Sequence, residues 1–384
     1  MGKTISATTS DNKPRYELLD GLRGVAALLV VLYHFGEGFA TSPVDQMMNH
    51  GYLAVDFFFV LSGFVIGYAY DSRWKNGNMT PWRFMLRRII RLHPMVVLSV
   101  VLGALAFIIQ GSVKWDGSPV PLHAVMLSLL MGLFLIPSAP GAFPEVRGNG
   151  EMFPLVGPSW SLFFEYIGSI LYGFWLHSLS RKGLVAVLII SAIGLASCAF
   201  ANISGAYHIG FGWSMADYGF LGGFFRLSFS FTAGLLLSRN FRKINIRGAF
   251  WLCAAIIAAV LSCPYVGSST EPSILNAAYD IAATFFIFPA VVYLGACGMT
   301  SDSFSGATCE FLGRLSYPLY IIHYPAMYLF YAWVWNNHIS FHEAVPVCVA
   351  IFFGVILAAW LALRFYDEPL RRFLSRKLLR RARD

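Results

Sequence analysis

Charged side chains are scarce in this sequence, because Asp, Glu, Lys and Arg together make up 12% of its 384 residues. A soluble domain carries about 25% charged residues, so the composition excludes a soluble enzyme or binding module. Hydrophobic residues reach 57%, and apolar runs recur along the whole chain. The short alternating segments of transmembrane strands are missing. The sequence therefore predicts an all-α, polytopic transmembrane helical bundle.

Cysteine is sparse as well, and the six cysteines are scattered singly without the spacing of metal ligands. We expect them to pack as small apolar side chains, and we expect no metal site. The N-terminal residues lack the apolar core of a cleavable signal peptide. Three parts are predicted: a disordered cytoplasmic tail over 1–15, one integral membrane domain over 16–370, and a basic cytoplasmic tail over 371–384.

Basic residues are confined to a few polar segments, chiefly the loop 71–93, the stretch RNFRKINIR and the tail RRFLSRKLLRRARD. Cytoplasmic loops carry the excess of Lys and Arg. All these segments fall on one side only if the short apolar stretch 122–137 does not cross the membrane. We therefore predict about ten spans, with both termini cytoplasmic. Residues 112–157 are then an outer segment, re-entrant or interfacial. The net charge of +8 reflects this orientation and attraction to anionic lipid, with no nucleic-acid partner.

The first apolar stretch, LDGLRGVAALLVVLYHF, contains an arginine and a histidine. Arg23 and His34 are about three helical turns apart, so both project from nearly one face, about 16 Å apart along the axis. A charge at this depth is costly unless it finds water or a partner. We expect this face to line a polar cavity, with Arg23 toward the cytoplasm and His34 in the outer half. A structural polar pair and a transporter's proton relay are the alternatives.

The second stretch, GYLAVDFFFVLSGFVIGY, places Asp56 beside three phenylalanines in the outer half of the membrane. A carboxylate there needs a partner, and we predict that Asp56 orients His34 and fixes its tautomer. A structural Asp–His or Asp–Arg pair is the alternative. Gly63 and Gly67 lie one turn apart and predict close packing against a neighbouring helix.

The segment TPWRFMLRRIIRLHP is predicted to form an interfacial helix that is capped by Thr80 and limited by Pro94. Its basic residues include Arg87, Arg88 and Arg91. Arginine offers forked donors to phosphate oxygens, which lysine does not match. The segment therefore either rests on anionic lipid or binds a phosphate group.

Two later stretches place further polar side chains at membrane depth. In GPSWSLFFEYIG, Ser161 and Glu165 are one turn apart and share a face. In GRLSYPLYIIHYP, one face carries Ser316, Tyr320 and His323. Ionisable residues inside a membrane usually face the bundle interior and indicate a functional site.

Together these stretches resemble the membrane-bound acyltransferase family 3, which includes O-antigen and exopolysaccharide acetylases. The resemblance covers roughly residues 16–370, and the motifs that carry it are LDGLRGVAALLVVLYHF, VDFFFVLSGF, RRIIRLHP, WSLFFE, LSYPLYIIH and YDEPLRR. The family's elements match Arg23 with His34, Arg88 with Arg91, Ser62–Gly63–Phe64, and Trp160–Ser161 with Glu165.

The resemblance implies an acyltransferase of the bacterial inner membrane. It would move an acyl group, expected to be acetyl, from cytoplasmic acyl-CoA to a hydroxyl of an extracytoplasmic or lipid-linked glycan. The residues expected to bind the acyl-CoA phosphates are Arg23, Arg87, Arg88 and Arg91, and those expected to line the substrate cavity are Ser62, Trp160, Ser161, Tyr320 and His323.

Within this hypothesis His34 is the general base on the acceptor hydroxyl, oriented by Asp56 or Glu165. A covalent acyl-histidine is an alternative route. The mechanism requires a water-accessible path from the basic inner rim to His34. The competing class is a proton-coupled secondary transporter, which is disfavoured because the sequence does not show two related halves.

Overall fold

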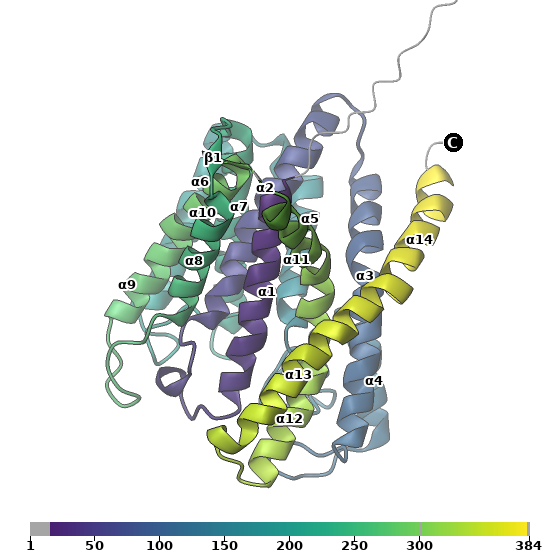
Figure 1. The fold of residues 1–384 in the computed structure, drawn as a ribbon, viewed down its shortest axis with the longest axis vertical. Helices are drawn as coiled ribbons and strands as arrows, with labels where there is room; N and C mark the ends of the chain where they lie inside the picture. Colours follow the sequence, from purple (N-terminus) through teal and green to yellow (C-terminus); the bar gives the residue numbers. More distant parts are fainter. Residues whose placement is uncertain (1–15, 300–301, 382–384) are drawn as a thin grey trace, which may run out of the picture.

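The computed structural model describes residues 16–299 and 302–381, and the predicted tail 1–15 lies outside them. The helices form one bundle along its long axis (Figure 1). Its first half contains α1 (Glu17–Glu37), α2 (Ala54–Lys75), α3 (Pro81–Ile109), α4 (Leu122–Leu133), α5 (Ser159–Phe174), α6 (Arg181–Phe200), α7 (Gly219–Asn240) and α8 (Ala249–Ser262). The second half contains α9 (Leu275–Ala282), the π-helix η4 (Ala283–Ile287), α10 (Phe288–Cys297), α11 (Ser303–Ile322), α12 (Tyr324–Asn336), α13 (Phe341–Ala362), the π-helix η5 (Leu363–Asp367) and α14 (Glu368–Arg381).

The remaining elements are short. Three 3-10 turns are η1 (Pro43–Asp45), η2 (Gly51–Leu53) and η3 (Leu176–Ser178). The strands of the described residues are β1 (Ile246–Arg247) and β2 (Gly298–Met299), which pair in parallel. The prediction of an all-α fold is therefore confirmed.

Helix length and composition identify a multi-pass membrane protein. Seven helical segments of the described residues are long and apolar enough to cross a bilayer. The last of them joins α13, η5 and α14 into one helix that lies obliquely across the bundle, and the start of α1 and the end of α14 lie toward the same end (Figure 1). By contrast, α4 has 12 residues and a length of about 18 Å, less than the hydrocarbon core of about 30 Å. The count of about ten spans stays a prediction.

Helices α2 and α7 pack with their backbones very close together. A Cβ atom on Gly63 would lie 2.0 Å from the carbonyl oxygen of Phe231, and one on Gly234 would lie 2.1 Å from that of Val60. Neither position tolerates a side chain without moving a helix. The packing predicted from Gly63 and Gly67 is therefore confirmed, since small residues let membrane helices approach closely.

Helix α3 begins where the sequence predicts but ends later than predicted. Thr80 caps α3 by accepting a hydrogen bond from the backbone N–H of Arg83 at 3.3 Å, as expected. Pro94 does not end the helix, which continues to Ile109. A membrane helix tolerates proline because its neighbours re-satisfy the freed backbone groups, so the basic segment is the first part of a long helix.

The cysteines of the chain lie within the described residues and all are free thiols. Cys198, Cys253, Cys297 and Cys309 are buried, and the other two are partly buried. Their packing as small apolar side chains is therefore confirmed.

Candidate functional site

A cavity of about 770 Å³, including the space at its mouth, lies between α1, α2, α3, α5 and α11. Its polar lining consists of Arg23, Ser62, Arg88, Arg91, Ser161, Glu165, Ser316, Tyr317 and Tyr320, and the rest of the wall is apolar. Residues from five separate sequence stretches that were predicted to contribute to a site meet at this wall. The predicted site residues that are not part of this wall are Arg87, Trp160, His34, Asp56 and His323.

Arg23 is fixed between α1 and α11. Its Nε donates to the Ser316 hydroxyl at 2.8 Å, and its Nη2 donates to the Gly313 carbonyl at 3.0 Å. Asp20, one turn earlier, lies 3.3 Å from Nη2. The guanidinium is thus held rigidly at the cavity wall with part of its charge balanced.

Arg88 and Glu165 form an ion pair across the cavity wall. Arg88 also donates to the Ser169 hydroxyl at 3.1 Å, and Ser62 donates to Glu165 at 3.2 Å. The alternative prediction that Glu165 orients His34 is therefore wrong, because an arginine on α3 takes up its carboxylate.

Arg91 is the free cation of this wall. It is exposed, and within the described residues it has no ion-pair partner. Arg23 and Arg88 repel it electrostatically, and Asp20 and Glu165 attract it less strongly, so an anion bound here would relieve the repulsion. Arg87, on the same helix, has a buried Nε without a hydrogen-bond partner.

His34 is oriented by a residue that the sequence arguments missed. Its Nδ1 lies 2.6 Å from Oε2 of Glu37, and Tyr331 donates to the same oxygen at 3.0 Å and to the His34 carbonyl at 2.7 Å. A nitrogen facing a carboxylate carries the proton, so Nε2 keeps a free lone pair. Glu37 lies one turn after His34 on α1, and this spacing was the available signal.

Asp56 does not reach His34. It forms a fully buried ion pair with Arg226 of α7, through Nε to Oδ1 at 3.1 Å and Nη2 to Oδ2 at 2.6 Å. Arg226 also donates to the carbonyls of Phe211 at 2.6 Å and Tyr52 at 2.9 Å. The prediction that Asp56 orients His34 is wrong, and the structural Asp–Arg alternative is correct. The lone arginine within the apolar run GFFRLSF was the overlooked signal.

The cavity and His34 are separated by one side chain. Tyr320, which lines the cavity and shares a 2.7 Å hydrogen bond with Ser161, has its ring centroid 6.3 Å from that of His323. His323 in turn stacks on His34 at 5.3 Å. The open path predicted from the basic rim to His34 is therefore interrupted. His323 is fully buried, its Nδ1 bonds to the Leu319 carbonyl at 2.9 Å, and its Nε2 has no partner.

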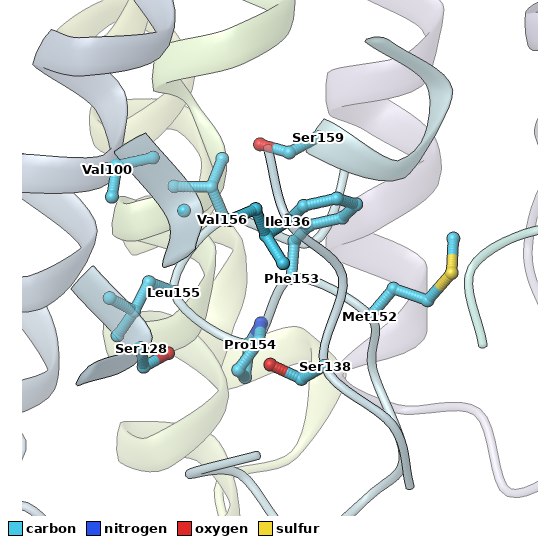
Figure 2. A pocket seen from close by; sticks show the side chains of 11 residues that line it. Val100, Ser128, Ile136, Ser138, Met152, Phe153, Pro154, Leu155, Val156 and Ser159 are labelled. Carbon is cyan, nitrogen blue, oxygen red and sulfur yellow. The ribbon is translucent and has the colours of Figure 1, made fainter. Parts of the chain in front are cut away.

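A smaller cavity of about 230 Å³ lies between α3, α4 and the segment that precedes α5. Figure 2 shows a largely apolar lining, with the hydroxyls of Ser128, Ser138 and Ser159 as its polar side-chain groups. None of the predicted site residues lines it, and it has no ionisable side chain. It therefore belongs to the packing of α3, α4 and the segment that precedes α5, and not to the candidate site.

These features define a multi-pass membrane protein with a basic internal cavity and a histidine–carboxylate pair near the other end of the bundle. A family model described as an acyltransferase domain matches residues 16–364. The chain belongs to this family, acyltransferase family 3, and it is an acyltransferase. Family membership favours this class over the secondary transporter.

Three curated relatives illustrate the range of the family. Protein 2 in the picA locus of Rhizobium radiobacter is 39% identical over 47% of this chain and 93% of its own length. The peptidoglycan O-acetyltransferase OatA of Listeria monocytogenes is 22% identical over 96% of this chain and 58% of its own length. The acyltransferase MdmB of Streptomyces mycarofaciens is 31% identical over 48% of this chain and 44% of its own length. The chain thus spans about half the length of the latter two. No solved structure matches it.

Proposed function

We propose that this chain transfers an acyl group, acetyl in the first instance, from acyl-CoA on the cytoplasmic side to a glycan hydroxyl on the outer side of the bacterial inner membrane. The observation that carries the proposal is that the arginine-lined cavity and His34 lie toward opposite ends of one helix bundle. Arginines face a cavity toward the end where α1 begins, and a general base lies near the end where α1 finishes.

The proposed binding of the acyl-CoA donor rests on the positive charge of the cavity arginines. Coenzyme A is polyanionic, and Arg91 offers a guanidinium that forms no ion pair with a carboxylate of the described residues, whereas Arg23 and Arg88 do. Arg23 and Arg88 add positive charge to the same wall while their own hydrogen bonds keep them in place. The phosphates would bind at these arginines, and the apolar part of the cavity would receive the pantetheine arm and the thioester.

The acceptor half rests on the free nitrogen of His34. Nε2 takes the proton from the acceptor hydroxyl as its oxygen attacks the thioester carbonyl carbon. The C–S bond breaks, the coenzyme A thiolate leaves, and the imidazolium returns its proton to that sulfur. Glu37 stabilises the imidazolium in between. His323 and Tyr320 stand where the thioester must pass to meet the hydroxyl.

Mass analysis of envelope glycans tests the function in cells. Cells that produce the chain should carry an acyl mass increment that cells without it lack, and His34→Ala at equal membrane abundance should remove it. Full acylation by His34→Ala would rule out this histidine as the base. The mass increment names the acyl group, and the molecule that carries it names the acceptor.

A further inference from the structure

An aromatic cluster lies directly beside the His34–Glu37 pair, in a part of the bundle that the donor cavity does not reach. It consists of Trp335 and Tyr331 on α12 and Trp115 in the segment between α3 and α4. Tyr331 and Trp335 are stacked, with ring centroids 5.5 Å apart and an interplanar angle of 19°. Trp115 meets Trp335 edge-on at 4.8 Å. Despite these contacts, Trp335 is 43% exposed.

Each ring of this cluster is held in place by a polar contact. The indole N–H of Trp335 donates to the Gly38 carbonyl at 2.8 Å. Tyr331 donates to Glu37 at 3.0 Å. The guanidinium of Arg147, which is fully buried, lies 4.9 Å from the ring centroid of Trp115. A tryptophan that only anchors a protein in the interfacial belt directs its polar edge to the headgroups, whereas this N–H is used inside the protein.

The cluster is joined to the proposed general base through one oxygen. Oε2 of Glu37 accepts from Tyr331, which stacks on Trp335, and from His34. The Glu37 side chain is itself 31% exposed. The same surface therefore offers a partly exposed indole, a carboxylate that accepts hydrogen bonds, and the proposed general base.

We propose that this cluster is the acceptor subsite and that it binds a pyranose ring. A pyranose presents one face of C–H bonds and a rim of hydroxyls. The C–H face matches the open side of Trp335, because aromatic rings bind positively polarised C–H edges. The rim hydroxyls match Glu37, with one hydroxyl directed toward His34. This inference rests on the proposed function and names the half of the site that the donor cavity does not supply.

The test measures acyl transfer from radiolabelled acetyl-CoA to glycans extracted from envelopes of a strain that lacks the chain. Trp335→Ala should raise the KM for the glycan at least about tenfold, as loss of a stacking platform does elsewhere, while the KM for acetyl-CoA stays within about twofold. Trp335→Phe keeps a ring and should recover most of the affinity. Trp213→Ala is the matched control, because Trp213 is similarly exposed at 46% and lies in the loop that precedes α7, outside the cluster.

The possible outcomes distinguish an acceptor subsite from a lipid-interface anchor and from failure of the proposed function. An unchanged glycan KM in Trp335→Ala overturns the subsite. A loss of membrane abundance or thermal stability that Trp335→Phe does not repair, with the glycan KM unchanged, makes Trp335 a lipid-interface anchor instead. Absence of any label transfer by the wild-type protein overturns the proposed function itself, which is a different failure.

Discussion

Replacing Glu37 by glutamine removes the charge that faces His34 and little else. Glutamine keeps the size of the side chain and an oxygen that Tyr331 can donate to. The His34 Nδ1 to Glu37 Oε2 distance of 2.6 Å is that of a charge-assisted hydrogen bond. If Glu37 stabilises the imidazolium, the loss appears in the rate of transfer and not in the binding of acyl-CoA.

The expected fall in kcat follows from the free energy of the His34–Glu37 hydrogen bond. A hydrogen bond to a charged group contributes about 1.5–3 kcal/mol, and each 1.4 kcal/mol, roughly, is a factor of ten in rate. We therefore expect kcat of Glu37→Gln to fall about 10- to 150-fold, with the KM for acyl-CoA changed less than about threefold.

The assay is acetyl transfer by purified protein in lipid nanodiscs, with the folded fraction measured in parallel. Asp56→Asn is the contrasting variant, because Asp56 pairs with Arg226 and not with His34; its kcat per folded molecule should stay within about threefold of the wild type. If Asp56→Asn loses the rate and Glu37→Gln keeps it, the assignment of the orienting carboxylate is refuted.

Three further outcomes are expected. Asp56→Ala leaves the guanidinium of Arg226 buried without its counter-ion, so unfolding followed by tryptophan fluorescence in detergent should show a loss of about 3–5 kcal/mol; unchanged stability would contradict the role of the pair. Arg91→Ala should raise the KM for acyl-CoA about tenfold or more, whereas Arg83→Ala, also on α3 but outside the cavity wall, should not; equal effects would argue for general attraction to the membrane. Burial raises the pKa of Glu151, in the outer segment between α4 and α5, from 4.5 to about 7. The unfolded chain then loses its proton first, so stability should fall by about 3 kcal/mol as the pH rises from 4.5 to 7. Glu151→Gln should abolish this slope in melting temperatures measured across that range, and a slope that persists would assign it to another group.

The helical architecture could be predicted from short sequence segments, because each segment that crosses a bilayer must be apolar and helical whatever its neighbours are. Scarce charge and repeated apolar runs were enough to predict a helical bundle. One-turn spacing was enough to bring Ser161 and Glu165 to the same cavity wall. The glycine spacing of α2 correctly predicted close packing.

Pairing between distant segments could not be predicted in the same way. Asp56 needed a partner, and the sequence offered both a histidine on α1 and an arginine on α7. The choice depends on which helices touch, and α2 packs extensively on α7 but little on α1. Pro94 was misread for a related reason, since its cost depends on the neighbours that surround α3. The catalytic and binding roles of the site residues stay predictions until they are measured.

The fully buried ring of His323 between Tyr320 and His34 has a physiological consequence. A continuous file of water between a basic rim and an imidazole would conduct protons and discharge the gradient that the cell maintains. Packed rings at this position leave no room for such a file. Under the proposed function, the donor arm would displace these rings during turnover, and their return would close the route to protons.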